Sequence, residues 1–285
     1  MKEKLLQTDK GNIYYLQSEN WDAGAETIFF LHGLTADHSM FDEQTAYFKN
    51  EYNVLAWDAP GHGKSRPFEE FDFGDAAGYM KAILDEYSVA KVVLAGQSLG
   101  GYFAQAFIKR YPDRAKAFIS IDGTPYGLEY YSKFDTWILK QIGWMADLYP
   151  FGWMKRAMAK QVSATQKAYD NMMRMLAPYN KRELSRLMGN AYAAFLKDNC
   201  DLRIPCPVLL ILGEKDVTGK VAKYNKEWAE KTGYPLEIIK GAAHNANVDK
   251  PREVNDRIRD FLATLNNPRS GLFCEFCLRQ NISRP

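Results

Sequence analysis

Short apolar runs alternate with amphipathic stretches along most of the chain. Runs of four or five residues, the length of a buried strand, lie at 28–31, 54–57, 92–95, 118–121, 208–212 and 236–239. Stretches with a helical period lie between or after them, at 40–49, 74–87, 101–110, 221–231 and 252–265. A hairpin over 5–17 precedes the first run. This alternation predicts an α/β fold, with a mostly parallel sheet flanked by helices on both faces.

Residues 124–201 interrupt the alternation because they contain no strand pattern. They predict four helices, at 126–149, 152–162, 164–176 and 181–197, with Pro150, Ser163 and Pro178 between them. We therefore expect one core formed by residues 1–123 and 202–267, with a helical cap inserted at 124–201.

Large apolar side chains are frequent in this predicted cap. They are Trp137, Trp144, Met145, Trp153, Met154, Met172, Met173 and Met175. Any one of them could simply dock a cap helix on the core. Together they predict a mainly hydrophobic, adaptable pocket, because methionine adjusts to varied shapes.

A serine flanked by glycines stands where the run 91–95 meets a helical stretch. Gly96-Gln-Ser-Leu-Gly-Gly101 fits G-x-S-x-G, which places a nucleophilic serine on a sharp turn from strand to helix. Side chains at Gly96 or Gly100 would crowd this turn. An ordinary serine in a glycine-rich turn is the alternative, but the context predicts that Ser98 is a nucleophile.

A serine hydroxyl needs a base, and the base needs an orienting acid. His244 follows the strand-like run 235–239, and Asp216 follows the run 207–212. Both therefore fall in loops at the carboxyl ends of predicted strands. Asp122 also ends a strand and competes with Asp216 for the role of the acid, although Asp216 is favoured.

The apolar segment Thr27–Leu34 runs into a His-Gly turn. Acyl transfer develops an oxyanion, which preorganised backbone N–H groups stabilise. One donor is expected at Leu99, directly after the nucleophile, and the other at Leu34 in this early turn.

At these residues the chain resembles the α/β-hydrolase superfamily, over roughly residues 10 to 265. The matching segments are His32-Gly33-Leu34, Asp58 to Ser65, Gly96 to Gly100, Gly213 to Asp216 and Gly241 to His244. The resemblance implies the α/β-hydrolase fold with a cap and a triad in the chain order Ser98, Asp216, His244. It also implies that His32 and His62 stabilise loops. Nothing in its surroundings marks His38.

Composition excludes several classes of partner. The formal net charge is +2 and no basic stripe is present, so nucleic-acid binding is disfavoured. No apolar stretch approaches the roughly 18 residues of a membrane span, and no signal peptide is recognisable, so we expect a cytoplasmic protein. Cys274 and Cys277 form a lone C-x-x-C that cannot complete a zinc site. Residues 268–285 are expected to be a disordered tail or an expression remnant.

The sequence thus predicts a serine hydrolase that cleaves a small to medium carboxylic ester, a lactone or thioester included, through an acyl-enzyme. The expected partner is a small molecule with an apolar acyl part, and no metal or organic cofactor is expected. A carbon–carbon hydrolase or lyase with the same triad is one alternative. A ligand-binding receptor on a hydrolase scaffold is another. The physiological substrate and the oligomeric state stay open.

Overall fold

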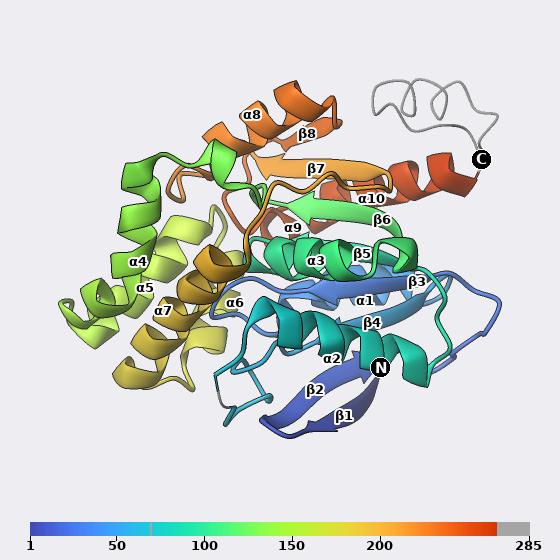
Figure 1. The fold of residues 1–285 in the computed structure, drawn as a ribbon, viewed down its shortest axis with the longest axis horizontal. Coiled ribbons are helices and arrows are strands. Elements are labelled where there is room, and N and C mark those ends of the chain that lie inside the picture. The colour runs from blue at the N-terminus through green and yellow to red at the C-terminus, as the bar shows by residue number, and fades with distance from the viewer. Residues whose placement is uncertain (69, 267–285) are drawn as a thin grey trace.

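A computed structural model describes residues 1–68 and 70–266, so the predictions for Cys274, Cys277 and the tail lie outside the described residues. Its centre is an eight-stranded sheet with the strand order β1-β2-β4-β3-β5-β6-β7-β8 (Figure 1). The strands are β1 (Lys2–Thr8), β2 (Gly11–Gln17), β3 (Thr27–Leu31), β4 (Asn53–Trp57), β5 (Val92–Gln97), β6 (Ala115–Ile121), β7 (Val208–Gly213) and β8 (Leu236–Ile239).

Most strands of the sheet run parallel, and most of these are buried on both faces. The six strands from β4 to β8 in the sheet order pair in parallel, whereas the hairpin β1–β2 joins β4 antiparallel at the edge. Every residue of β3, β4, β5 and β7 is buried, as expected for apolar strands covered on both faces. The mostly parallel α/β fold predicted from the alternating pattern is confirmed.

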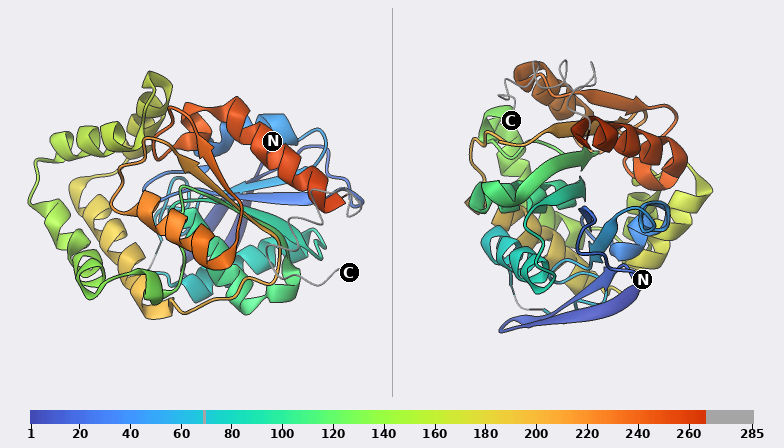
Figure 2. Two further views of the ribbon diagram at one scale, coloured as in Figure 1. Left: turned by 90° about the horizontal axis from the view of Figure 1, so that it is seen from above. Right: turned by 90° about the vertical axis from the view of Figure 1, so that its right-hand side faces the viewer.

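Helices cover both faces of the sheet. They are α1 (Asp42–Phe48), α2 (Phe73–Glu86), α3 (Leu99–Arg110), α8 (Val221–Thr232), α9 (Ala246–Asp249) and α10 (Pro251–Asn266). Figure 2 shows α2, α3 and α8 on one face and α1 and α10 on the other. Among the described residues, no helix has the length and apolar character needed to cross a bilayer.

Four further helices separate β6 from β7. They are α4 (Lys133–Asp147), α5 (Phe151–Val162), α6 (Gln166–Leu176) and α7 (Lys181–Asp198). α4 packs on α7 and α5 on α6, and the group lies beside the end of the sheet toward which the β6 arrow points (Figure 1). Because β6 is parallel to its neighbours, this is the end at which loops carry the predicted site residues.

The first of these helices begins later than the apolar pattern predicts. The expected helix 126–149 is replaced by a 3-10 turn, Leu128–Tyr130, followed by α4 from Lys133. The Ser132 side chain accepts from the Asp135 N–H, while Asp135 accepts from the Ser132 N–H. This capping box satisfies N–H groups that a helix leaves open at its start, and so sets the start of α4.

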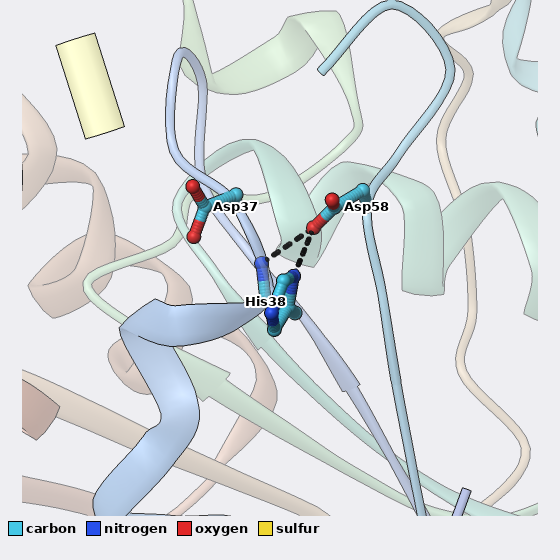
Figure 3. A group of neighbouring side chains, drawn as sticks. All are labelled: Asp37, His38 and Asp58. Carbon is cyan, nitrogen blue, oxygen red and sulfur yellow. Dashed lines mark hydrogen bonds and ion pairs between the residues drawn. The ribbon is translucent and has the colours of Figure 1, made fainter. Parts of the chain in front are cut away.

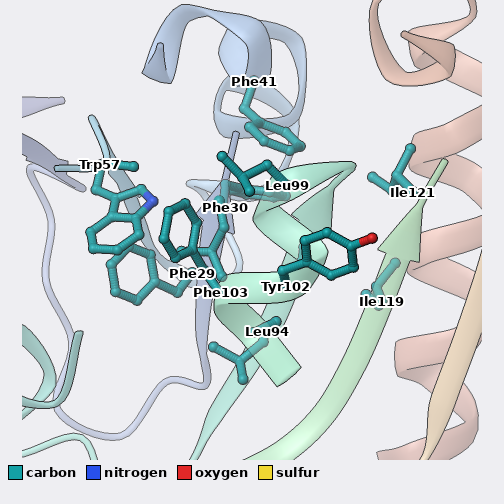
Figure 4. Packing of buried hydrophobic residues seen from close by; sticks show 14 of the residues in the cluster. Phe29, Phe30, Phe41, Trp57, Leu94, Leu99, Tyr102, Phe103, Ile119 and Ile121 are labelled. Carbon is teal, nitrogen blue, oxygen red and sulfur yellow. The ribbon is translucent and has the colours of Figure 1, made fainter. Parts of the chain in front are cut away.

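Aromatic packing holds α3 against the sheet. Trp57 lies edge-on to Phe29, with ring centroids 5.7 Å apart, and to Phe103 of α3, at 5.3 Å (Figure 4). Leu99 at the start of α3 belongs to the same buried cluster. The core therefore holds α3, which begins directly after Ser98, against strands β3 and β4.

Candidate active site

Ser98 occupies the turn between β5 and α3. Its φ of 50° lies in the left-handed region, where side chains other than that of glycine are strained. A Cβ on Gly96 would fall within 3.0 Å of the Gly100 backbone, and a Cβ on Gly100 within 3.0 Å of Leu31. The flanking glycines therefore let β5 and α3 approach closely enough to form this sharp turn.

His244 and Asp216 come together from two loops. The Nδ1 of His244 is 2.8 Å from Oδ2 of Asp216, and both residues are buried. Asp216 also accepts from the Thr218 N–H at 2.8 Å, so its carboxylate is fixed. Gln97, next to Ser98, donates from Nε2 to the His244 carbonyl at 2.8 Å and holds the histidine loop beside β5.

Among residues 1–68 and 70–266, no hydrogen bond joins Ser98 Oγ to the imidazole of His244. The link between the two loops is instead the hydrogen bond from Gln97 to the His244 carbonyl. The structure thus brings His244 and Asp216 into contact and anchors their loop to the strand that carries Ser98.

The competing acid, Asp122, has other partners. Its Oδ1 accepts from the Gly213 N–H at 2.7 Å, and its Oδ2 accepts from the Ala246 N–H at 3.1 Å. Burial, reinforced by the nearby charge of Asp216, raises the pKa of Asp122 well above its usual range. Asp122 therefore ties β7 to α9, while the histidine side chain bonds to Asp216.

Two backbone N–H groups are available near Ser98. Leu99 is the first residue of α3, so its N–H has no intrahelical acceptor. Leu34 lies in the turn after β3, where its N–H has no acceptor within the part of the chain that the structure describes. Both leucines line the same cavity as Ser98. This is the arrangement expected of the two predicted oxyanion donors.

The cavity at Ser98 has a volume of about 280 Å³. Its apolar wall comes from Ile138, Leu139 and Ile142 of α4 and from Val221 of α8. Four tyrosines and two threonines also line it, none of which sequence reasoning singled out: Tyr102, Thr124, Tyr131, Tyr192, Thr218 and Tyr224. Tyr102 is one helical turn after Ser98, and that spacing is a signal by which it could have been found.

Three of these hydroxyls form a closed cluster. Tyr102 lies 2.6 Å from the Thr124 hydroxyl and 2.8 Å from that of Tyr131, which also donates to the Pro125 carbonyl. The Tyr192 hydroxyl, by contrast, has no hydrogen-bond partner within the described residues. One side of the cavity is therefore apolar, and the other offers a free hydroxyl.

The tryptophans expected in the pocket wall lie elsewhere, which corrects the sequence prediction. Trp137, Trp144 and Trp153 are each more than half exposed. Met154, Met172 and Met175 are buried in the core cluster. They therefore dock helices on the core, which is the alternative role given above. None of the eight large residues named from segment 124–201 lines the cavity at Ser98. The cavity does have an apolar wall, but Ile138, Leu139, Ile142 and Val221 form it.

His32 and His62 are fully buried in the turns after β3 and β4. His32 Nδ1 lies 2.8 Å from the Gly33 carbonyl, and its Nε2 accepts from the Ala59 N–H. His62 Nδ1 lies 3.0 Å from the Pro60 carbonyl, but its Nε2 has no partner among the described residues. Both imidazoles therefore hold loop backbone, as the sequence predicts.

Burial of His62 makes stability depend on pH. Burial, assisted by the neighbouring His32, lowers the pKa of His62 to about 3. Between this value and the ordinary pKa of about 6.5, the unfolded chain binds a proton that the folded protein does not, so acidification destabilises the fold. From pH 7 to pH 5, His62 alone should remove about 2 kcal/mol from the free energy of unfolding.

The variant His62→Asn keeps a donor near the position of Nδ1 but does not titrate. Urea unfolding at pH 7 and pH 5 should therefore show a smaller loss of stability in the variant, by about 2 kcal/mol. Equal losses in the two proteins would show that His62 is not a neutral buried group.

His38 pairs with Asp58, which the sequence did not indicate. Oδ1 of Asp58 accepts from both the backbone N–H and Nδ1 of His38, each at 2.7 Å, and its Oδ2 accepts from the Lys64 N–H (Figure 3). Burial alone would lower the pKa of His38, but the hydrogen bond and charge of Asp58 raise it. With Asp37 the two form a group that could geometrically hold a metal ion. Their oxygens are already used to shape the loops.

A sequence profile described as the alpha/beta hydrolase family matches residues 28–257. The carboxylesterase YbfK of Bacillus subtilis is 28% identical over 284 residues, which cover 90% of this chain and 86% of YbfK. The 2-succinyl-6-hydroxy-2,4-cyclohexadiene-1-carboxylate synthase of Citrobacter koseri is 24% identical, over 88% of this chain and 99% of the synthase. The solved structure of a thermophilic esterase from Thermogutta terrifontis superimposes with a TM-score of 0.74 at 19% identity, covering 93% of this chain and 99% of the esterase. Sequence profile and fold agree, and the chain belongs to the alpha/beta hydrolase family.

Proposed function

We propose that the protein is a serine hydrolase that cleaves a small to medium carboxylic ester. One observation carries the proposal: Ser98, on its strained turn, lines a cavity together with two residues whose N–H groups are free. A strained serine beside free donors is the preorganisation that acyl transfer requires. The His244–Asp216 pair adds the base and its orienting acid.

The reaction follows from these groups. His244 takes the proton of Ser98 as Oγ attacks the ester carbonyl, and Asp216 holds the imidazole and stabilises its cation. The N–H groups of Leu34 and Leu99 receive the oxyanion. The alcohol leaves with the proton from His244, and water activated by the same histidine then releases the acid from Ser98.

The cavity limits the substrate. Its volume of about 280 Å³ lies just below the range of about 300–1,000 Å³ typical of pockets for drug-sized ligands. Ile138, Leu139 and Ile142 suit an apolar acyl part, and the free Tyr192 hydroxyl suits a polar group on it. We further propose that residues 124–201 act as a cap, with α4 as the roof of the cavity.

Chain-length preference tests this role of α4. The variant Ile142→Trp should lower the ratio of p-nitrophenyl butyrate to acetate turnover about tenfold, because each methylene that loses apolar contact costs roughly 0.8 kcal/mol. Trp144→Ala, on the same helix but exposed, is the matched control and should leave the ratio unchanged. A lower ratio in the control, or an unchanged one in Ile142→Trp, would assign the acyl site to other residues.

Labelling with a fluorophosphonate tests the proposed function directly. The reagent should modify the folded wild-type chain at Ser98 and leave Ser98→Ala unlabelled, because only an activated serine attacks the phosphorus. Turnover of any activated ester well above the level of Ser98→Ala would also exclude a receptor without catalysis.

A carbon–carbon hydrolase or lyase with the same triad is the second candidate, because the chain is also similar to the Citrobacter koseri synthase, whose name is not that of an esterase. In a lyase reaction the triad would act as a base and no acyl group would reside on Ser98. Detection of an acyl-enzyme therefore separates the two functions.

A further inference from the structure

Helix α4 has a second apolar face that points away from the cavity. Phe134, Trp137, Trp144 and Leu148 follow one another at intervals of three, seven and four residues, so they form one stripe along the helix. Each is more than half exposed. The residues of α4 that line the cavity, Ile138, Leu139 and Ile142, lie on another side of the helix.

The exposed stripe continues through the turn into α5. Leu148 is 68% exposed and Trp153 is 53% exposed, and the Trp153 ring stacks on Tyr149 with centroids 5.4 Å apart. Figure 1 and the left view of Figure 2 show the turn between α4 and α5 projecting from the molecule, far from the sheet. We call the residues Phe134, Trp137, Trp144, Leu148, Tyr149 and Trp153 the aromatic tip.

Basic side chains are frequent in the segment that carries the aromatic tip. Segment Lys133–Val162 contains five lysines and arginines and two aspartates, whereas the whole chain has a net charge of only +2. Asp135 pairs with Lys220, and Asp147 accepts from Ser185. Lys133, Lys140, Arg156 and Lys160 are exposed and form no ion pair with any described residue. The tip therefore combines exposed aromatic groups with unpaired positive charge.

This combination matches an anionic lipid surface. Tryptophan and tyrosine favour the interface between headgroups and acyl chains, and lysine and arginine are attracted to anionic headgroups. A second copy of the chain would instead bring two sets of unpaired cations together, and a projecting turn offers little flat area for a dimer. We propose that the aromatic tip docks the protein on the surface of an anionic bilayer, with Leu148 and Trp153 entering the interface.

Vesicle flotation with the full chain tests this proposal. The protein should float with vesicles of phosphatidylcholine and phosphatidylglycerol and much less with pure phosphatidylcholine, and added salt should weaken the binding. The double variant Leu148→Ser/Trp153→Ser should bind about tenfold or more weakly, because it removes the inserting groups. Leu5→Ser is the matched control, since Leu5 is 60% exposed on β1, away from the tip, and should bind like wild type.

Folding and oligomeric state are followed in the same samples. Far-UV circular dichroism should be the same for all variants, and hydrolysis of p-nitrophenyl acetate without vesicles should be unchanged. Equal binding to the two vesicle types, an equal loss of binding in Leu5→Ser, or no vesicle binding at all would overturn the proposal. A dimer that the double variant dissociates, without vesicle binding, would also overturn it and would identify a second copy as the partner.

Discussion

Replacing Ser98 with alanine is expected to lower kcat/KM for p-nitrophenyl acetate by about 10⁴- to 10⁶-fold, because loss of a triad nucleophile removes most of the acceleration. The fold should survive, since the Ser98 N–H still donates to the Ile121 carbonyl. Alanine also keeps a Cβ on the strained turn, so the variant changes only the hydroxyl. We therefore expect Ser98→Ala to lose ester hydrolysis and to keep the thermal unfolding curve of the wild-type protein.

Retained activity in Ser98→Ala would contradict this prediction. If Ser98→Ala hydrolyses the ester at a rate close to that of wild type, the hydroxyl is not the nucleophile. Activity would then have to come from another group, and the strained turn would have only a structural role.

The second large effect concerns the two aspartates. Asp216→Asn should lower kcat/KM about 10³- to 10⁴-fold, because the amide no longer supports the correct tautomer and the cation of His244. Its volume is nearly that of aspartate, so little change in stability is expected. Kinetic constants are measured per folded enzyme, with unfolding curves recorded on the same preparations.

Asp122→Asn is the matched variant. Its carboxylate accepts from the N–H groups of Gly213 and Ala246, and an amide can accept only on one side. The variant should therefore lose about 1–3 kcal/mol of stability while its folded fraction keeps most of its activity. A far larger loss of activity in Asp122→Asn than in Asp216→Asn would move the orienting acid to the end of β6.

The sheet, and the position of Ser98 between a strand and a helix, could be predicted from the sequence. Fully apolar strands differ in length from amphipathic helices, so the alternation was visible without any contact information. The G-x-S-x-G segment also predicted a sharp turn, because glycines are needed where β5 and α3 approach each other closely.

Sequence order alone could not decide between Asp122 and Asp216. Both end parallel strands, and such residues gather at one edge of a sheet whatever their role. Only the observed 2.8 Å contact from His244 to Asp216 distinguishes them. The His38–Asp58 pair was hidden for a similar reason, since its partners are twenty residues apart in different loops.

The sequence does not show which apolar residues of α4 face the cavity, because this helix is apolar on two sides. Periodicity identifies an apolar face but not what covers it, so the pattern alone predicts that large side chains such as Trp144 form the wall of the pocket. The structure instead uses Ile138 and Ile142 there and leaves the tryptophans exposed. A helix with two apolar faces is itself a signal of a second contact surface.

Ser98 is expected to carry the acyl group during turnover. Mixing the enzyme with p-nitrophenyl acetate, quenching within the first turnovers and measuring the peptide masses tests it most directly. We predict one acetyl group on the peptide that contains Ser98, formed in a burst with release of nitrophenol. Continued hydrolysis with no acylated Ser98 at any quench time would contradict it and would indicate that the triad acts as a base.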